Sequence, residues 1–319
     1  MNLMPEKNPD RLRLLVKICQ LYYEDGLNQL DIAKRLGISR PHVSRMLTAA
    51  KNEGIVRIAI HNPFSAEQEL EKLIIKKFGI QDALVVDSSD IAASRLHSLL
   101  GRASAPLLES VLKDGDIVGV MAGRTIGRVA EELDYFPVAG LHFVPLVGGW
   151  GSDGESCHAN SNATAFANKL KSKYSIIHAP AVVASEETGL LLREEPEIAK
   201  VLKLAQNCRV AIVSIGEMSE QATMVTSGSF KPDEVNDLKE RGAAANLCAS
   251  FVDRDGQEIS FPGANRMIGL TVRELRGIPS VIGIAGGTGK VEAVTAALRG
   301  KWVDILVTDT VVAREIVSS

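Results

Sequence analysis

The first 60 residues place apolar and polar side chains with the period of amphipathic helices. Apolar residues recur at three- and four-residue steps from Leu12 onward, which predicts a helix over residues 9–24. Asn28 and Ser39 are residue types that cap helix N-termini, and Gly37 lies between the two segments that follow them. Two further short helices are therefore expected, the second with Pro41 in its first turn. Residues 55–60 alternate like a strand.

From residue 63 the pattern changes to short, continuously apolar runs followed by helix-periodic segments. Such strands alternate with helices in parallel sheets that are covered on both faces, which is the α/β class. A hairpin insertion is expected over 249–259, around the turn Asp253-Arg-Asp-Gly256. The expected strands are residues 83–86, 117–122, 141–147, 210–215, 281–285 and 305–308, and the expected helices include 66–78, 124–133, 160–171, 197–205 and 290–298.

The two patterns predict two domains in a chain of 319 residues, with a boundary between residues 62 and 63. Residues 1–60 hold 10 Lys and Arg against 6 Asp and Glu, a net charge of +4, whereas the remainder carries −7. A basic N-terminal segment followed by an acidic remainder indicates that the protein binds a polyanion through its N-terminal segment only.

Composition excludes several classes of protein. Hydrophobic residues make up 45% and charged residues 24%, so neither a disordered nor a fibrous chain is expected. The four cysteines are scattered without metal-ligand spacing, and the N-terminus lacks the apolar core of a signal peptide. Residues 135–152 are broken by Pro137 and Pro145 and make a poor membrane span. A soluble, cytoplasmic protein is expected.

Residues 29–47 have the spacing of a helix-turn-helix, with small Ala33 at the helix crossing and Gly37 at the turn. The second helix presents hydrogen-bonding side chains at its N-terminal part, which suits the major groove of double-stranded DNA. The alternative is a three-helix bundle used only for protein contacts. The expected DNA-binding residues are Gln29, Ser39, Arg40, Pro41, His42, Ser44 and Arg45.

Three glycine-rich loops follow apolar strands and run into helices: Gly119-Val-Met-Ala-Gly-Arg-Thr125, Val147-Gly-Gly-Trp-Gly151 and Gly283-Ile-Ala-Gly-Gly-Thr-Gly-Lys290. Loops at the carboxyl ends of parallel strands hold ligands, and free backbone N–H groups at a helix start bind anions. Arg124 and Lys290 add positive charge, and Thr125 and Thr288 add hydroxyl donors. The alternative is that the glycines only make tight turns.

No catalytic motif accompanies these loops. A triphosphate-binding loop would need glycine at Ile284 and Ser or Thr at Val291, and no nucleophile elbow or zinc-binding pair is present. We expect no catalytic residue, metal or cofactor. Trp150 could cover a sugar face or pack in the core. His158, in a polar stretch with Asn162, is a further candidate ligand contact, with a solvated loop histidine as the alternative.

The chain resembles the SorC family of bacterial sugar-responsive transcriptional regulators, which includes deoxyribonucleoside-operon and central-glycolysis regulators. The resemblance covers nearly the whole chain. It is carried by Tyr22-Tyr-Glu-Asp-Gly-Leu-Asn-Gln29, Ile38-Ser-Arg-Pro-His-Val-Ser-Arg45, Lys113-Asp-Gly-Asp-Ile-Val-Gly119, Leu146-Val-Gly-Gly149, Asp253-Arg-Asp-Gly256, Ala285-Gly-Gly-Thr-Gly-Lys290, Ala297-Leu-Arg-Gly300 and Leu306-Val-Thr-Asp309.

The resemblance implies a Rossmann-like domain, similar to sugar-phosphate isomerases and deaminases, that keeps the binding cleft without catalysis. By similarity, the effector cleft takes Gly123, Arg124, Thr125, Gly148, Gly149 and Lys290. Two departures remove charged contacts found in some relatives: Val147 precedes the glycine pair, and Asn246 stands where others have an acidic residue. Asn246 is then a neutral hydrogen-bonding partner, so a free sugar or polyol stays open beside the favoured sugar phosphate.

The leading hypothesis is a regulator, expected to be a repressor, of a carbohydrate-catabolic operon. Its domains are a DNA-binding domain over 1–62 and an effector-binding and oligomerisation domain over 63–319. A homo-oligomer, dimer or tetramer, is expected because helix-turn-helix heads read half-sites in pairs; helix 66–78 is a candidate part of that surface. The alternatives are an enzyme acting on sugar phosphates with a fused DNA-binding head, and a DNA-binding protein without an effector.

Overall fold

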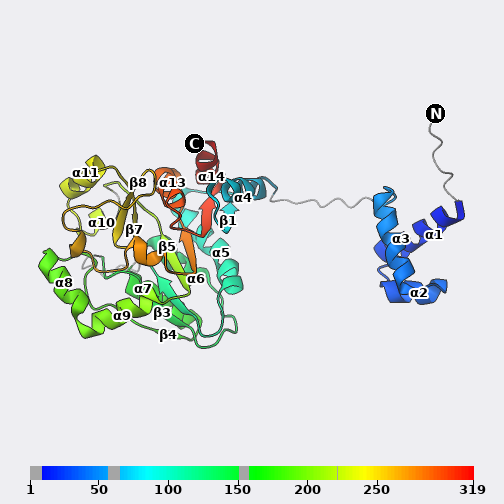
Figure 1. Cartoon of the computed structure of the whole chain (residues 1–319), viewed down its shortest axis with the longest axis horizontal. Helices are drawn as coiled ribbons and strands as arrows, with labels where there is room; N and C mark the ends of the chain where they lie inside the picture. The colour runs from blue at the N-terminus through cyan, green and yellow to red at the C-terminus, as the bar shows by residue number, and fades with distance from the viewer. Residues whose placement is uncertain (1–8, 57–64, 151–157, 221) are drawn as a thin grey trace. The chain divides into compact units, whose positions relative to one another are not determined.

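The computed structural model describes residues 9–56, 65–150, 158–220 and 222–319. The chain divides into two compact units, Met1–Pro63 and Phe64–Ser319, and each is taken by itself (Figure 1). No helix in the described ranges is long and apolar enough to cross a membrane.

The first unit is a helical bundle around a small apolar core. Helix α1 (Pro9–Cys19) continues as a π-helical segment (Gln20–Glu24), and α2 (Gln29–Leu36) and α3 (Arg40–Asn52) follow. The predicted caps are confirmed: the Asn28 side chain accepts from the N–H groups of Leu30 and Asp31, and the Ser39 hydroxyl accepts from that of His42. Gly37 takes the left-handed conformation that ends α2. The strand expected over 55–60 lies mostly outside the described residues.

The second unit is built on a seven-stranded sheet in the order β1-β10-β9-β5-β2-β3-β4, in which every pair of neighbouring strands is parallel. All six expected strands are present, with ends shifted by one or two residues. The two-residue strand β4 was not expected, because it is too short to show a pattern. The strands are β1 (Asp82–Val86), β2 (Ile117–Val120), β3 (His142–Pro145), β4 (Lys173–Tyr174), β5 (Val210–Ser214), β9 (Ser280–Ile284) and β10 (Ile305–Asp309).

Helices cover both faces of this sheet, so each central strand is buried on two sides. Along β5, Val210 and Ile212 join one core and Ala211 and Val213 join the other. The first core is closed by α5 (Ala93–Val111), α6 (Arg124–Glu132) and α7 (Ala159–Lys169). The second is closed by α4 (Ser65–Phe78), α9 (Pro196–Gln206), α13 (Val291–Arg299) and α14 (Thr310–Ser318).

A three-stranded antiparallel sheet packs on the second core, in the order β6 (Gly216–Glu217), β7 (Ala243–Leu247), β8 (Ser250–Asp253). The turn expected after Asp253 is present, and Ile259 N–H bonds back to the Phe251 carbonyl. The main partner of β8, however, is β7, whose run of alanines carries no strand signal. The remaining helices are α8 (Glu186–Glu194), α10 (Thr223–Thr226), α11 (Pro232–Glu240), α12 (Val272–Leu275) and the 3-10 turns Ala264–Arg266 and Thr288–Lys290.

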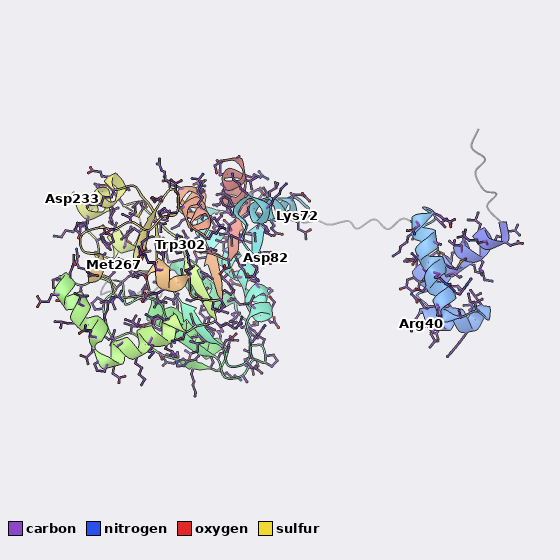
Figure 2. The ribbon with its side chains drawn as sticks, viewed as in Figure 1. Arg40, Lys72, Asp82, Asp233, Met267 and Trp302 are labelled. Carbon is purple, nitrogen blue, oxygen red and sulfur yellow. The ribbon has the colours of Figure 1, made fainter. Side chains whose placement is uncertain are left out.

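Two of the motifs that carry the family resemblance, Asp253-Arg-Asp-Gly256 and Ala297-Leu-Arg-Gly300, meet in one close backbone contact. A Cβ on Gly256 would lie 2.1 Å from the Gly300 nitrogen, so only glycine fits. Trp302 is labelled in Figure 2. Its indole N–H donates to the Gly256 carbonyl at 2.7 Å, and the Arg276 guanidinium stacks on that indole at 4.0 Å from the ring centre. The contacts among Gly256, Gly300 and Trp302 hold the turn after β8 against the end of α13.

The order of the large sheet reverses between two neighbouring strands. From β2 the chain proceeds to β3 and β4 on one side, whereas from β5 it proceeds to β9 and β10 on the other. The loops after β2 and β5 therefore diverge and leave a crevice beyond their carboxyl ends. Ligands of open α/β sheets bind in such crevices.

Candidate functional site

A cavity of about 360 Å³ opens at this reversal point. Its size falls within the range of small-molecule sites. The loops after β2, β5 and β9 supply most of the lining, and the starts of α5 and α10, the Trp150 side chain and β7 supply the rest. Six of the ten predicted effector residues line it: Gly123, Arg124, Thr125, Trp150, Asn246 and Lys290.

The wall after β2 is the start of α6, and no described side chain caps this helix. Gly123 has φ +135°, and a Cβ there would lie 3.0 Å from the Ser214 hydroxyl, so the sharp turn into α6 needs glycine. The first N–H groups of α6 point to its N-terminal end, where Arg124 adds its guanidinium. Thr125 places its hydroxyl 2.8 Å from His97 Nδ1 on α5. This wall combines the groups that bind an anion.

The wall after β9 is the loop Gly286 to Lys290, and buried Asp309 holds it in place. Asp309 accepts the Gly287 N–H with one carboxylate oxygen, and with the other it accepts the first N–H groups of α14. A Cβ on Gly286 would lie 2.5 Å from that carboxylate. The Leu306-Val-Thr-Asp309 match thus marks the anchor of the loop that carries Lys290.

Lys290 meets a carboxylate inside the cavity. Its Nζ lies 3.5 Å from Glu217 Oε2 on β6. Burial lowers the pKa of Lys290 below its usual value; the charge and hydrogen bond of Glu217 act in the opposite direction, and the charge of Arg124 adds to the lowering. Arg124 and Lys290 thus line the same cavity, one from the wall after β2 and the other from the wall after β9.

His97 adds a titratable group to this space. Burial lowers the pKa of His97, and the positive charges of Arg124, Lys290 and Arg128 lower it further. The imidazole is therefore kept neutral at pH 7, ready to donate or accept a hydrogen bond beside Thr125.

Trp150 and Asn246 line the cavity and also make contacts within the fold. Trp150 is 4% exposed and packs in the core that contains Met121 and Ala122. The Asn246 side-chain amide donates to the carbonyls of Cys248 and Ser250, at 3.3 and 3.0 Å. Its NH₂ group thus holds the β7–β8 turn, and its Oδ1 is what remains for a ligand.

The other four predicted effector residues lie outside the described lining. Gly148 and Gly149 continue the chain after β3 by bonding to the carbonyls of Ile268 and Ala179, and a Cβ on Gly148 would strike the Ala179 and Pro180 backbone. Gly148 is therefore needed for close packing, whereas a Cβ on Gly149 would meet nothing within 4 Å. His158 is the N-cap residue of α7 and Asn162 lies in its first turn, because the polar stretch is helical from Ala159. Asn162 donates hydrogen bonds to the carbonyls of Met121 and Gly123, in the loop that lines the cavity.

The lining residues that the sequence did not single out include His97, Ser214 and Glu217. His97 belongs to a helical pattern, where nothing in the sequence sets it apart. Ser214 and Glu217 had a usable signal, since they end and follow the strand next to β2, at the same edge as the glycine loops.

In the first unit, α3 presents an exposed polar face. Ser39, Arg40, Pro41, Ser44 and Arg45 are exposed, whereas His42 and Gln29 are half-buried. Arg40 lies at the start of α3 (Figure 2). Thr48, one turn beyond Ser44, is exposed on the same helix and was not predicted. Val43, Met46 and Leu47 form the opposite, buried face.

Comparison with known proteins matches a separate family to each of the two compact units. Residues 62–318 match the family described as "Putative sugar-binding domain", and residues 18–57 match the winged helix-turn-helix DNA-binding family. The sorbitol operon regulator of Klebsiella pneumoniae is 30% identical over 305 residues, 95% of this chain and 97% of that protein. The crystal structure of this full-length regulator, SorC, matches with a TM-score of 0.74 at 29% identity, over 97% of this chain and 99% of that one. The chain belongs to the SorC family.

The SorC family membership confirms the expected architecture, an N-terminal helix-turn-helix followed by a sugar-binding α/β domain. A second relative, the deoxyribonucleoside regulator of Bacillus subtilis strain 168, is 29% identical over 309 residues, 97% of this chain and 98% of that protein. Like these relatives, this SorC-family chain is a DNA-binding transcriptional regulator.

Proposed function

We propose that this regulator controls a carbohydrate-catabolic operon and that a sugar phosphate, bound in the cavity at the sheet reversal, changes its affinity for operator DNA. One observation carries the proposal: the uncapped start of α6 with Arg124 faces the same space as Lys290 from the opposite wall. Helix N–H groups and a two-pronged guanidinium suit a phosphate, and the remaining polar lining suits hydroxyl groups.

The two roles are assigned to residues 1–62 for DNA and 63–319 for the effector and for assembly. The compact units and the two matched families support this division. We further propose a homo-oligomer, because one small head covers a single half-site. Mass measurement at micromolar concentration tests this: a monomer that keeps full operator affinity would refute it.

Calorimetric titration with matched phosphorylated and free sugars tests the effector. We expect the phosphorylated member of a pair to bind more tightly and to change operator affinity in a DNA-binding titration. Arg124→Ala should lose most of that binding. Arg128→Ala is the matched control, because Arg128 lies one turn further along α6 and is paired with Glu131 on the surface. Tighter binding of the free sugar, unaffected by Arg124→Ala, would contradict the phosphate assignment.

An enzyme acting on sugar phosphates is the competing function for the same cavity. The named relatives are regulators, which favours binding without turnover. Among the described lining residues, Glu217 is the one carboxylate, and it faces Lys290 rather than a second carboxylate. Incubation of the purified protein with sugar phosphates should leave them unchanged; catalytic turnover that Glu217→Gln abolishes would favour the enzyme.

A further inference from the structure

Glu217 is an acidic residue in a cavity otherwise suited to anions. It lies on β6, whose pairing with β7 joins Glu217 to Ala245 and so fixes its backbone. Its Oε1 accepts the Ser219 hydroxyl at 3.0 Å, and its Oε2 lies 3.5 Å from Lys290 Nζ. A Cβ on Gly289 would lie 3.0 Å from Oε2, so the β9 loop can approach the carboxylate because residue 289 is glycine. The carboxylate is therefore held from several sides.

This carboxylate makes the surroundings of the two cations in the cavity chemically different. Arg124 has no carboxylate partner within the described residues, so the α6 end keeps a full positive charge beside the helix N-terminus. On the wall after β9, Glu217 offsets Lys290, and the pair offers both an acceptor and donors. Sugar hydroxyl groups both donate and accept hydrogen bonds, which suits such a mixed pair.

We propose that Glu217 selects a sugar monophosphate and rejects the bisphosphate of the same sugar. The phosphate lies at the Arg124 end, and free hydroxyl groups at the far end of the sugar bind the Glu217–Lys290 pair. A second phosphate placed there would meet the Glu217 carboxylate, and Lys290 is already paired with that carboxylate. This inference rests on the proposed function, because it assumes a phosphorylated sugar in this cavity.

The charge of Glu217 is large enough to decide between the two ligands. Two like charges several ångströms apart in a partly buried site repel strongly enough to change affinity by about tenfold or more. Side chains of Glu217 and Lys290 are 22% and 26% exposed, so water screens their charges only in part. Removal of the carboxylate should therefore change preference as well as affinity.

The test uses the full chain and three matched probe pairs: fructose 6-phosphate with fructose 1,6-bisphosphate, glucose 6-phosphate with glucose 1,6-bisphosphate, and ribose 5-phosphate with ribose 1,5-bisphosphate. Calorimetry gives the ratio of the two dissociation constants in each pair. The wild type should prefer the monophosphate. Glu217→Gln keeps the shape and removes the charge, so the ratio should move toward the bisphosphate by about tenfold or more.

Two further variants make the result specific. Glu217→Asp keeps the charge and should keep the preference for the monophosphate. Glu240→Gln makes the same chemical change on the exposed end of α11 and should leave the ratio unchanged. Phosphate binding that depends on Arg124, together with an unchanged ratio in Glu217→Gln, would overturn this inference alone. Failure of every phosphorylated probe to bind would overturn the inference and the proposed function together.

Discussion

The Asn162 side-chain amide on α7 donates to the carbonyl oxygen of Gly123, at 3.2 Å, and to that of Met121, at 3.0 Å. Asn162 is 1% exposed, and its bond to Met121 is buried whereas its bond to Gly123 is partly buried. They fix the loop after β2 immediately before the start of α6. The residue that the sequence suggested as a ligand contact thus sets the position of the residues that face the ligand.

Asn162→Ala should destabilise the protein and weaken effector binding. Loss of the amide leaves the buried Met121 carbonyl and the partly buried Gly123 carbonyl without this donor, which costs about 1–3 kcal/mol. Chemical denaturation measures the free energy of unfolding. The control Asn168→Ala changes an exposed asparagine on the same helix and should have little effect. Equal stability of the two variants would contradict the supporting role.

Arg40→Ala and Arg45→Ala should each weaken operator binding, by about 1–3 kcal/mol where the arginine reads a base. Both side chains are exposed on the part of α3 that suits the major groove. A gel-shift titration at fixed salt checks this. Arg13→Ala, an exposed arginine on α1, should cost less. An unchanged operator affinity in the double variant would remove these residues from the DNA contact.

Effector binding should be coupled to protonation of His97. Its pKa lies below the ordinary 6.5, through burial first and then through the charges of Arg124, Lys290 and Arg128. The neutral form therefore stabilises the ligand-free fold above pH 6.5, and this contribution is lost as the pH falls toward the lowered pKa. A bound anion favours the charged imidazole and raises its pKa, so affinity should rise as the pH falls through that window.

Sulfate is a suitable probe of this coupling, because it keeps its charge over the range concerned. NMR titration of His97 with and without sulfate should show the pKa moving upward on binding. In His97→Gln, the gain in sulfate affinity at low pH should be lost. A His97 pKa that sulfate leaves unchanged would place the anion away from this histidine.

Gly256→Ala should lower the free energy of unfolding much more than Gly242→Ala. The new Cβ meets the Gly300 backbone, and φ is +77°, so a cost above about 3 kcal/mol is expected. Gly242→Ala is the matched control: its φ is +92° but nothing lies within 4 Å of the new Cβ, so a cost near about 1 kcal/mol is expected. Thermal and chemical unfolding measure both.

The fold was predictable because each strand of the large sheet is a separate apolar run, as at 210–215 and 305–308. The small sheet was less so, because alanines at 243–245 pack there through tertiary contacts that no local pattern records. At the site, Arg124 and Lys290 were found because loops after parallel strands share one edge. His97 and the structural roles of Gly148 and Asn162 depend on which elements pack together, and spacing along the chain does not give that.

The reversal of strand order bears on the resistance of the regulator to proteolysis. The cavity draws on residues from α5 to β9, nearly 200 positions along the chain, so an occupied cavity ties both halves of the sheet together. A ligand at 100 times its dissociation constant adds about 2.7 kcal/mol to folding stability. Since proteolysis acts on unfolded molecules, such a ligand slows degradation. If the proposed effector binds there, its supply would then influence the amount of regulator in the cell as well as the occupancy of the operator.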